Sequence, residues 1–205
     1  MKIADRLTRV FFEQPTLEVA KKLLGQRLVR IGPDQARLSG IILETEAYIG
    51  RDDLACHARS GKTARNMSMW DDPGRTYVYF IYGMHWMLNI VTEIAGLPAA
   101  VLIRSILPLE GTEQMAKMRN NPPLQELVNG PAKLCQALNI DRGLDGHDLC
   151  SPESRIFIEV EGTPGPNSVT SGPRVGLSSV PEPWKSKAWR FCLDPQIQHR
   201  GIPQH

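Results

Sequence analysis

Short segments rich in apolar and β-branched residues, separated by turn residues, predict that this chain is built mainly from β-strands. Helical periodicity is confined to three short stretches, at 16–24, 112–119 and 131–138. The expected strands cover 26–31, 36–47, 77–81, 86–92, 99–107, 155–160, 174–177 and 189–193. Because few of these strands are joined by helices, we expect an α+β fold with a curved antiparallel β-sheet flanked by short helices.

The strands at 77–81 and 86–92 lie close enough in sequence to form a protruding β-hairpin. Its turn is expected at 82–85, where Gly83 can adopt the positive φ that such a turn requires. The segment from 49 to 75 is polar and irregular. A stretch rich in Gly, Pro, Ser and Thr, 162–173, predicts a mobile surface loop, and 195–205 predicts a frayed tail.

Composition narrows the class of protein only slightly. The 205 residues fit one domain, 1–205, with room for a sizeable core. A net charge of +2 permits nucleic-acid binding without arguing for it. The chain has no apolar run of the roughly 20 residues that a membrane span needs, and its N-terminus has no apolar signal core. We therefore expect a cytoplasmic protein, and we expect it to be a monomer. The four cysteines form no Cys-x-x-Cys pair, so we expect them to be free thiols.

Two glutamates provide the first candidate chemistry. Glu44 and Glu46 lie two residues apart in a largely apolar strand, so both carboxylates should project from one face. A charged strand edge that faces water would explain the pair without any function. Acids inside an apolar strand are costly unless they are paired or used, however, and two carboxylates also suit a carbohydrate hydrolase.

All four tyrosines of the chain lie close to these acids or in the predicted hairpin: Tyr48, Tyr77, Tyr79 and Tyr82. Core packing accounts for the apolar residues of the hairpin strands. It does not account for an aromatic residue, a methionine and a histidine at the turn, because exposed apolar tips usually contact a partner. A wedge that enters a DNA base stack is one such use.

Two further residues have both a structural and a functional interpretation. His57 alone is more often a hydrogen-bonded structural residue than a catalyst. Lys133, in the first turn of the helix expected after Gly130, could hold a phosphate or be a solvated surface lysine. The His and Cys residues lack the spacing of zinc ligands, so we expect no metal site and no cofactor.

Together these residues resemble the alkyladenine (3-methyladenine) DNA glycosylases, the methylpurine DNA glycosylases without a helix-hairpin-helix. The resemblance runs from about residue 17 to 191. Each motif is weak alone, but their joint order and spacing are specific. The motifs are ETEAYIG at 44–50, His57, TARN at 63–66, YVYFIYGMHWMLN at 77–89, VLIR at 101–104, PLEG at 108–111, GPAKL at 130–134 and RVG at 174–176.

The resemblance implies roles for individual residues. Glu46 corresponds to the general base that activates water, with Arg104 and the backbone carbonyl of Val175 as further contacts of that water. The walls of a pocket for a flipped base would be Tyr48, His57 and Tyr79, and Asn89 would crowd the amino group of guanine. Tyr82 would fill the gap that the flipped nucleotide leaves, with Met84 beside it. Arg65 and Lys133 are candidates for contacts with the DNA backbone.

The implied function is a monofunctional DNA glycosylase of base excision repair that acts on double-stranded DNA containing damaged purines. Alkylated purines are the expected substrates, with deaminated purines as a second candidate class. The motifs at 44–50 and 77–89 contain no lysine that could form a Schiff base with the sugar, so no AP-lyase step is expected. Two alternatives stay open: a carbohydrate glycosidase that uses Glu44 and Glu46, and a non-catalytic binder of distorted DNA.

Overall fold

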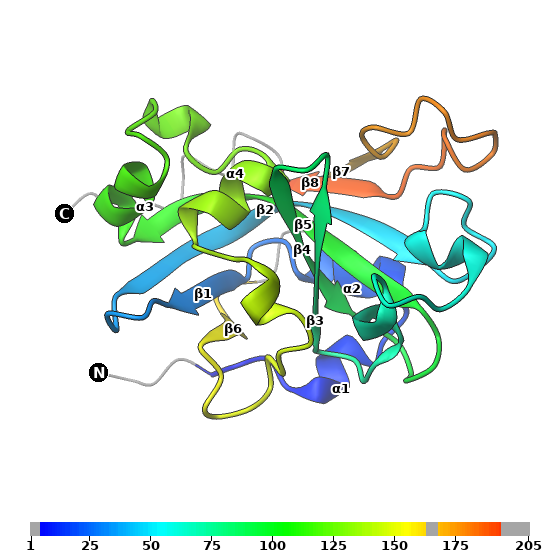
Figure 1. The fold of residues 1–205 in the computed structure, drawn as a ribbon, viewed down its shortest axis with the longest axis horizontal. Helices are drawn as coiled ribbons and strands as arrows, with labels where there is room; N and C mark the ends of the chain where they lie inside the picture. Colours follow the sequence, from blue (N-terminus) through cyan, green and yellow to red (C-terminus); the bar gives the residue numbers. More distant parts are fainter. Residues whose placement is uncertain (1–4, 163–167, 194–205) are drawn as a thin grey trace.

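The computed structural model describes residues 5–162 and 168–193, which form one curved antiparallel sheet with short helices against it (Figure 1). The fold class expected from the sequence is therefore confirmed. The strands are β1 (Arg27–Ile31), β2 (Arg37–Ile49), β3 (Thr76–Ile81), β4 (His85–Val91), β5 (Ala99–Glu110), β6 (Ile156–Glu159), β7 (Val169–Gly172) and β8 (Arg190–Leu193). The α-helices are α1 (Arg9–Phe12), α2 (Thr16–Lys22), α3 (Thr112–Met118) and α4 (Pro131–Ala137). Short 3₁₀ turns cover η1 (His57–Ser60), η2 (Met67–Trp70), η3 (Leu124–Glu126) and η4 (Arg142–Leu144).

The long strand β2 organises the sheet. The strand order is β3-β4-β5-β2-β1-β6, and β8 pairs with both β2 and β7. One edge of β2 pairs with β5 along most of its length. The other edge pairs first with β1 and then, at residues 44–46, with β8. The segment that carries Glu44 and Glu46 is therefore enclosed between two strands, rather than lying at an edge of the sheet.

Most of the hydrophobic core lies between the sheet and helices α2 and α4. Helix α2 packs on β2, where the buried Thr45 hydroxyl donates a hydrogen bond to the carbonyl of Ala20 at 2.8 Å. Helix α4 packs on β4 and β5. These contacts fix the strands that carry the candidate site, because the central strands have helices against them.

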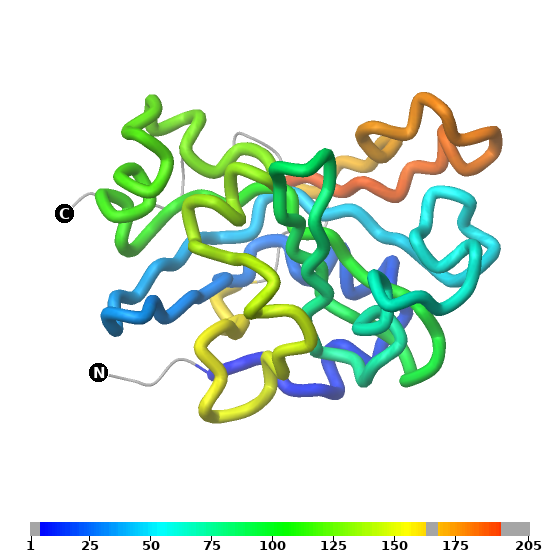
Figure 2. The backbone as a smooth tube through the Cα atoms, viewed as in Figure 1, coloured from blue at the N-terminus to red at the C-terminus, as the bar shows by residue number. Residues whose placement is uncertain are grey.

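A second, smaller cluster lies beneath the long connection between β2 and β3, which runs without a strand beside the sheet (Figure 2). Its buried members include Cys56, Ala58, Met69 and Tyr77. Three partly buried aromatic residues pack against it: Tyr48, Trp70 and Tyr79. This irregular segment therefore has its own core, which supports aromatic side chains from β2 and β3.

Two local predictions are wrong. Residues 174–177 form no strand but a turn, in which Gly176 has φ +79°. Within the expected mobile loop at 162–173, Val169–Gly172 form strand β7, whose backbone pairs with β8, whereas 163–167 lie outside the described residues. The tail expected at 195–205 lies outside the described residues. Among the described residues, no helix is long and apolar enough to cross a membrane.

Candidate active site

Glu46 lies at the centre of the site and is fully buried. One of its oxygens, Oε1, accepts a hydrogen bond from the Val175 backbone N–H at 2.7 Å and lies 3.4 Å from Nη1 of Arg104. The other oxygen, Oε2, accepts a hydrogen bond from the Tyr48 hydroxyl at 2.9 Å. The structure thus brings together four predicted site residues from three places in the sequence: β2, β5 and the turn after β7.

The protonation of Glu46 is set by opposing effects. Burial raises the pKa of Glu46 above its ordinary range, because the charged form loses its hydration. Arg104, the Val175 N–H and the Tyr48 hydroxyl lower that pKa, and the charge of Glu44 raises it further. Desolvation is the largest of these effects, so the net direction is upward. A carboxylate with a raised pKa is a stronger base than a solvent-exposed one.

Glu44 is engaged by arginines rather than facing water alone. Its Oε1 accepts from Nε of Arg104 at 2.9 Å and from Nη1 of Arg190 at 3.2 Å. The register between β2 and β5 shifts on both sides of Glu44, which marks an irregularity in the ladder at this residue. Arg104 consequently bridges the two acids, with Nε on Glu44 and Nη1 near Glu46.

An aromatic surface lies close to these acids. The ring of His57 packs edge-on against Tyr79 at 4.5 Å between centroids, and Nδ1 of His57 is 2.9 Å from the Tyr77 hydroxyl. Burial lowers the pKa of His57 to about 4, with Arg65 and Arg59 acting in the same direction. His57 is therefore neutral near pH 7. It can accept a hydrogen bond with one ring nitrogen and donate with the other.

Asn89 lies on β4 directly opposite Tyr77 of β3. Its side chain is almost fully buried, and Nδ2 donates a hydrogen bond to the Tyr77 carbonyl at 3.0 Å. This bond fixes the orientation of the amide group. Asn89 therefore extends the wall formed by Tyr77, Tyr79 and His57 with a rigidly held polar side chain.

The tip of the β3–β4 hairpin, near the upper centre of Figure 1, presents exposed apolar residues as expected. Tyr82 is 78% exposed and Met84 is 67% exposed. Both Tyr82 and Gly83 have positive φ, at +54° and +68°, and the Met84 N–H bonds to the Ile81 carbonyl at 3.2 Å. For tyrosine this backbone conformation is uncommon and strained, and such strain often accompanies function.

The two candidates for DNA-backbone contacts lie in different settings. Arg65 lies beside the aromatic wall, with its guanidinium 5.6 Å from the Tyr79 ring centroid and a hydrogen bond to the Phe80 carbonyl. Lys133 on α4 has an ion pair with Glu126 at 3.6 Å and a hydrogen bond to Asn129 at 2.8 Å. Within the described residues, no contact joins Lys133 to the Glu46 site, so its role stays a prediction.

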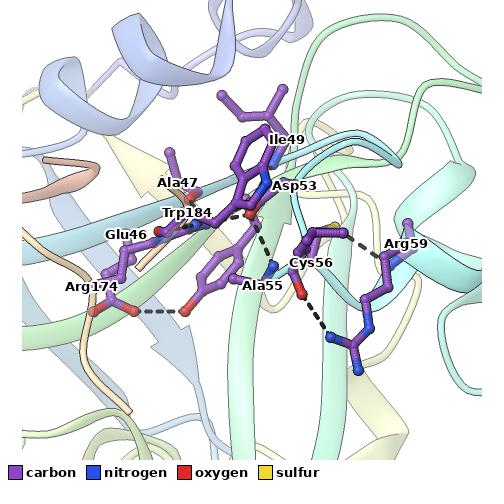
Figure 3. A network of polar contacts seen from close by, with 12 residues as sticks. Glu46, Ala47, Ile49, Asp53, Ala55, Cys56, Arg59, Arg174 and Trp184 are labelled. Atoms are coloured by element: carbon purple, nitrogen blue, oxygen red, sulfur yellow. Dashed lines mark hydrogen bonds and ion pairs between the residues drawn. The ribbon is translucent and has the colours of Figure 1, made fainter. Parts of the chain in front are cut away.

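Sequence reasoning gave no role to Asp53 or to Arg174, although both support the site. Their side chains form a fully buried ion pair, with oxygen–nitrogen distances of 2.5 and 2.9 Å (Figure 3). Asp53 was hidden within a run of polar residues that is typical of a solvated loop. Arg174 could be noticed only as the residue before Val175. Tyr77 was also missed as a partner of His57.

The described residues contain no candidate metal site. Among residues 5–162 and 168–193, no three His, Cys, Asp or Glu side chains gather closely enough to hold a metal ion. The four cysteines are all described, and each is a free thiol. The acidic groups of the site are two glutamates balanced by arginines, an arrangement that suits acid–base chemistry.

Comparison with known proteins agrees with this architecture. The family model of Methylpurine-DNA glycosylase (MPG) matches residues 10–196. A protein of Methanocella arvoryzae named "Putative 3-methyladenine DNA glycosylase" is 47% identical over 186 residues, covering 90% of each chain. A protein of the same name from Chlorobium luteolum is 45% identical over 97% of this chain and 98% of its own. The mouse protein "DNA-3-methyladenine glycosylase" is 42% identical over 93% of this chain and 60% of its own.

The class defined by fold, site and comparisons is that of DNA glycosylases, hydrolases that act on N-glycosyl bonds. Within that class, the chain belongs to the methylpurine-DNA glycosylase family. The family resemblance inferred from the sequence motifs is thereby confirmed.

Proposed function

We propose that this protein flips alkylated purines out of duplex DNA and hydrolyses the N-glycosyl bond with a water molecule that Glu46 activates. The observation that carries the proposal is the fully buried carboxylate of Glu46, held by Arg104, Tyr48 and the Val175 amide. Alkylated purines are the proposed substrates, with deaminated purines as a second candidate class. The named relatives support 3-methyladenine as the first lesion to test.

Departure of the purine leaves positive charge on the sugar, similar to an oxocarbenium ion. The Glu46 carboxylate can stabilise this charge and take a proton from the attacking water. Arg104, beside the same carboxylate, is proposed to help hold that water, as is the backbone carbonyl of Val175. Water is then the nucleophile, so no amine of the protein forms a covalent bond with the sugar.

The aromatic wall suits a flipped base. Every base has a π-face, so Tyr48, Tyr79 and His57 can stack on many purines. A purine that carries positive charge after alkylation gains additional attraction to electron-rich rings. An alkylated base that pairs weakly also costs less to extrude from the duplex. These two preferences favour alkylated over normal purines before any specific hydrogen bond forms.

Tyr82 is proposed to fill the space in the base stack that the flipped nucleotide leaves, with Met84 beside it. An exposed aromatic side chain on a rigid turn can replace the lost stacking. The cross-strand contact of Phe80 with Trp86, at 4.7 Å between ring centroids, stiffens the hairpin below the tip. Arg65 and Lys133 are proposed to contact phosphates of the DNA backbone.

The two alternatives fit the site less well. A non-catalytic DNA binder would have no use for a carboxylate whose burial is costly. A carbohydrate glycosidase would have no use for a strained and exposed tyrosine at a hairpin tip, and it would need Glu44 as a second free acid. Glu44 is instead engaged by Arg104 and Arg190.

Replacement of Glu46 by glutamine tests the proposed mechanism. We expect Glu46→Gln to lower single-turnover release of 3-methyladenine by about a thousandfold or more, because the base and the stabilising charge are lost. Affinity for lesion DNA should stay within a few-fold. Glu44→Gln is the matched control and should cost roughly tenfold, because glutamine still offers an oxygen to Arg104.

Equal losses in the two glutamine variants would indicate that both acids act in catalysis, as the paired acids of glycoside hydrolases do. Near-normal excision by Glu46→Gln would overturn the proposed role of Glu46.

Borohydride added during turnover should trap no covalent enzyme–DNA adduct, and a trapped adduct would overturn the monofunctional mechanism.

Removal of the exposed ring at the hairpin tip tests base flipping. We expect Tyr82→Ala to lower excision from duplex DNA by about tenfold or more, because an unstacking cost of a few kcal/mol is no longer offset. Single-stranded substrate should be affected less. Tyr82→Phe should retain most activity, and Ile94→Ala, which removes another exposed apolar side chain beyond the end of β4 opposite the hairpin tip, should retain all of it. Unchanged duplex kinetics in Tyr82→Ala would make Tyr82 a surface residue without this role.

Substitution of Asn89, whose side-chain amide is buried, tests how the protein discriminates against normal guanine. Guanine carries an exocyclic amino group that adenine-type bases lack, and a fixed side chain in that position rejects it. We expect Asn89→Ser and Asn89→Ala to raise release of normal guanine relative to alkyladenine by about tenfold. The ratio of the two rates in each enzyme is the measurement. A ratio equal to that of the wild type would remove Asn89 from this role.

A further inference from the structure

Asp53 and Arg174 form the most deeply buried ion pair among the described residues, and no catalytic step requires either charge. Both side chains are fully buried, and the guanidinium meets the carboxylate through two hydrogen bonds. Desolvation of two charges is costly, so a buried ion pair is weak evidence of a contribution to stability. The remaining contacts of the pair indicate what else it does.

The hydrogen bonds of this pair reach the backbone of three separate segments. Arg174 donates to the carbonyl of Ala47 at 2.9 Å and to the carbonyl of Trp184 at 3.3 Å. Asp53 accepts from the N–H of Ala55 at 3.1 Å and from the N–H of Ile49 at 3.3 Å. Strand β2, the turn before His57 and the segment after β7 are therefore joined at one point (Figure 3).

Apart from the bond to Trp184, these connections lie within three residues of Glu46 or His57 in the sequence. Ala47 follows Glu46 in β2, and Val175, whose N–H donates to Glu46, follows Arg174. Arg174 also lies against the ring of Tyr48, with its Cζ 4.7 Å from the ring centroid. The backbone carbonyl of Asp53 accepts from the Cys56 N–H at 2.8 Å, in the turn that leads to His57.

We propose that Asp53 and Arg174 are positioning residues, which hold the Val175 amide on Glu46 and fix Tyr48 and His57 as walls of the base pocket. This inference rests on the proposed function of Glu46. A bidentate arginine–carboxylate contact has a defined planar geometry, so it can fix the relative positions of segments far apart in sequence. A misplacement of about 1 Å at a reacting group can cost a hundredfold in rate.

The Val175 hydrogen bond offers a readout that a purely structural role would not change. This bond goes to the charged form of Glu46 and so lowers its pKa. If the ion pair holds Val175 in place, weakening the pair should loosen this bond and raise the pKa of Glu46. The carboxyl carbon of Glu46 can be followed through a pH titration by ¹³C NMR of the free protein, and its signal is assigned by its loss in Glu46→Gln.

Asp53→Asn is the principal variant, because asparagine keeps the size and one acceptor oxygen while the charge is removed. Arg174→Lys is the second variant, which keeps a positive charge but loses the two-pronged contact. Glu159→Gln is the matched control, because it breaks an ion pair with Arg37 on the same sheet outside the site. Every measurement is made well below the thermal unfolding midpoint of each variant.

We expect Asp53→Asn and Arg174→Lys to move the titration midpoint of Glu46 upward by about half a pH unit or more. Single-turnover release of 3-methyladenine should fall by about tenfold or more, with affinity for lesion DNA changed less than about threefold. Glu159→Gln should leave the midpoint and the rate at the wild-type values.

Folded variants with the wild-type midpoint for Glu46 and the wild-type rate would overturn the proposal. If neither variant folds, the pair is a determinant of stability and the positioning role is likewise overturned. A wild-type protein that releases no alkylated purine would refute the proposed function, whereas the NMR titration would still decide whether the ion pair positions Val175 on Glu46.

Discussion

The structure depends on one costly feature, a carboxylate placed in the interior of the long strand β2. Glu46 is fully buried between β5 and β8, so bulk solvent does not hydrate its charge. The surroundings supply what water would otherwise provide: a guanidinium, a backbone amide and a phenol hydroxyl. Burial nevertheless has the largest effect on its pKa, which stays above the ordinary range. A carboxylate in this balance suits the proposed role of general base.

The other parts of the molecule can be understood from this requirement. Three partners of Glu46 come from different segments, so the sheet must bring β2, β5 and the turn after β7 together. The paired register of β2 with β5 places Arg104, and the Asp53–Arg174 pair joins the turn to β2. The small core beneath the connection between β2 and β3 supports Tyr48, Tyr77 and Tyr79 at the same end of the sheet. The residues proposed for chemistry and for stacking thus share one support.

Much of this arrangement could be predicted from the sequence. The hairpin was predicted because a glycine lies between two apolar runs, and its tip is exposed as the mixture of Tyr82 and Met84 suggested. Motif order led to the family and to most of the residues around Glu46. The polar contacts between distant segments could not be predicted, since a buried Asp53 and a solvated Asp53 look alike in a polar run. The strand expected at 174–177 is wrong for a related reason. Those residues are held by tertiary contacts of Arg174 and Val175, which override their local preference for a strand.

The pH dependence of catalysis tests the central claim most directly. The measurement is single-turnover release of 3-methyladenine from duplex DNA by the wild-type protein, corrected for spontaneous loss of the base and confined to pH values at which the protein is folded. If charged Glu46 is the base, the rate rises with pH through a single ionisation. The midpoint lies above the pKa of an exposed glutamate, because burial disfavours the charged form. A rate that is independent of pH across this range, or that falls as pH rises, would contradict the account.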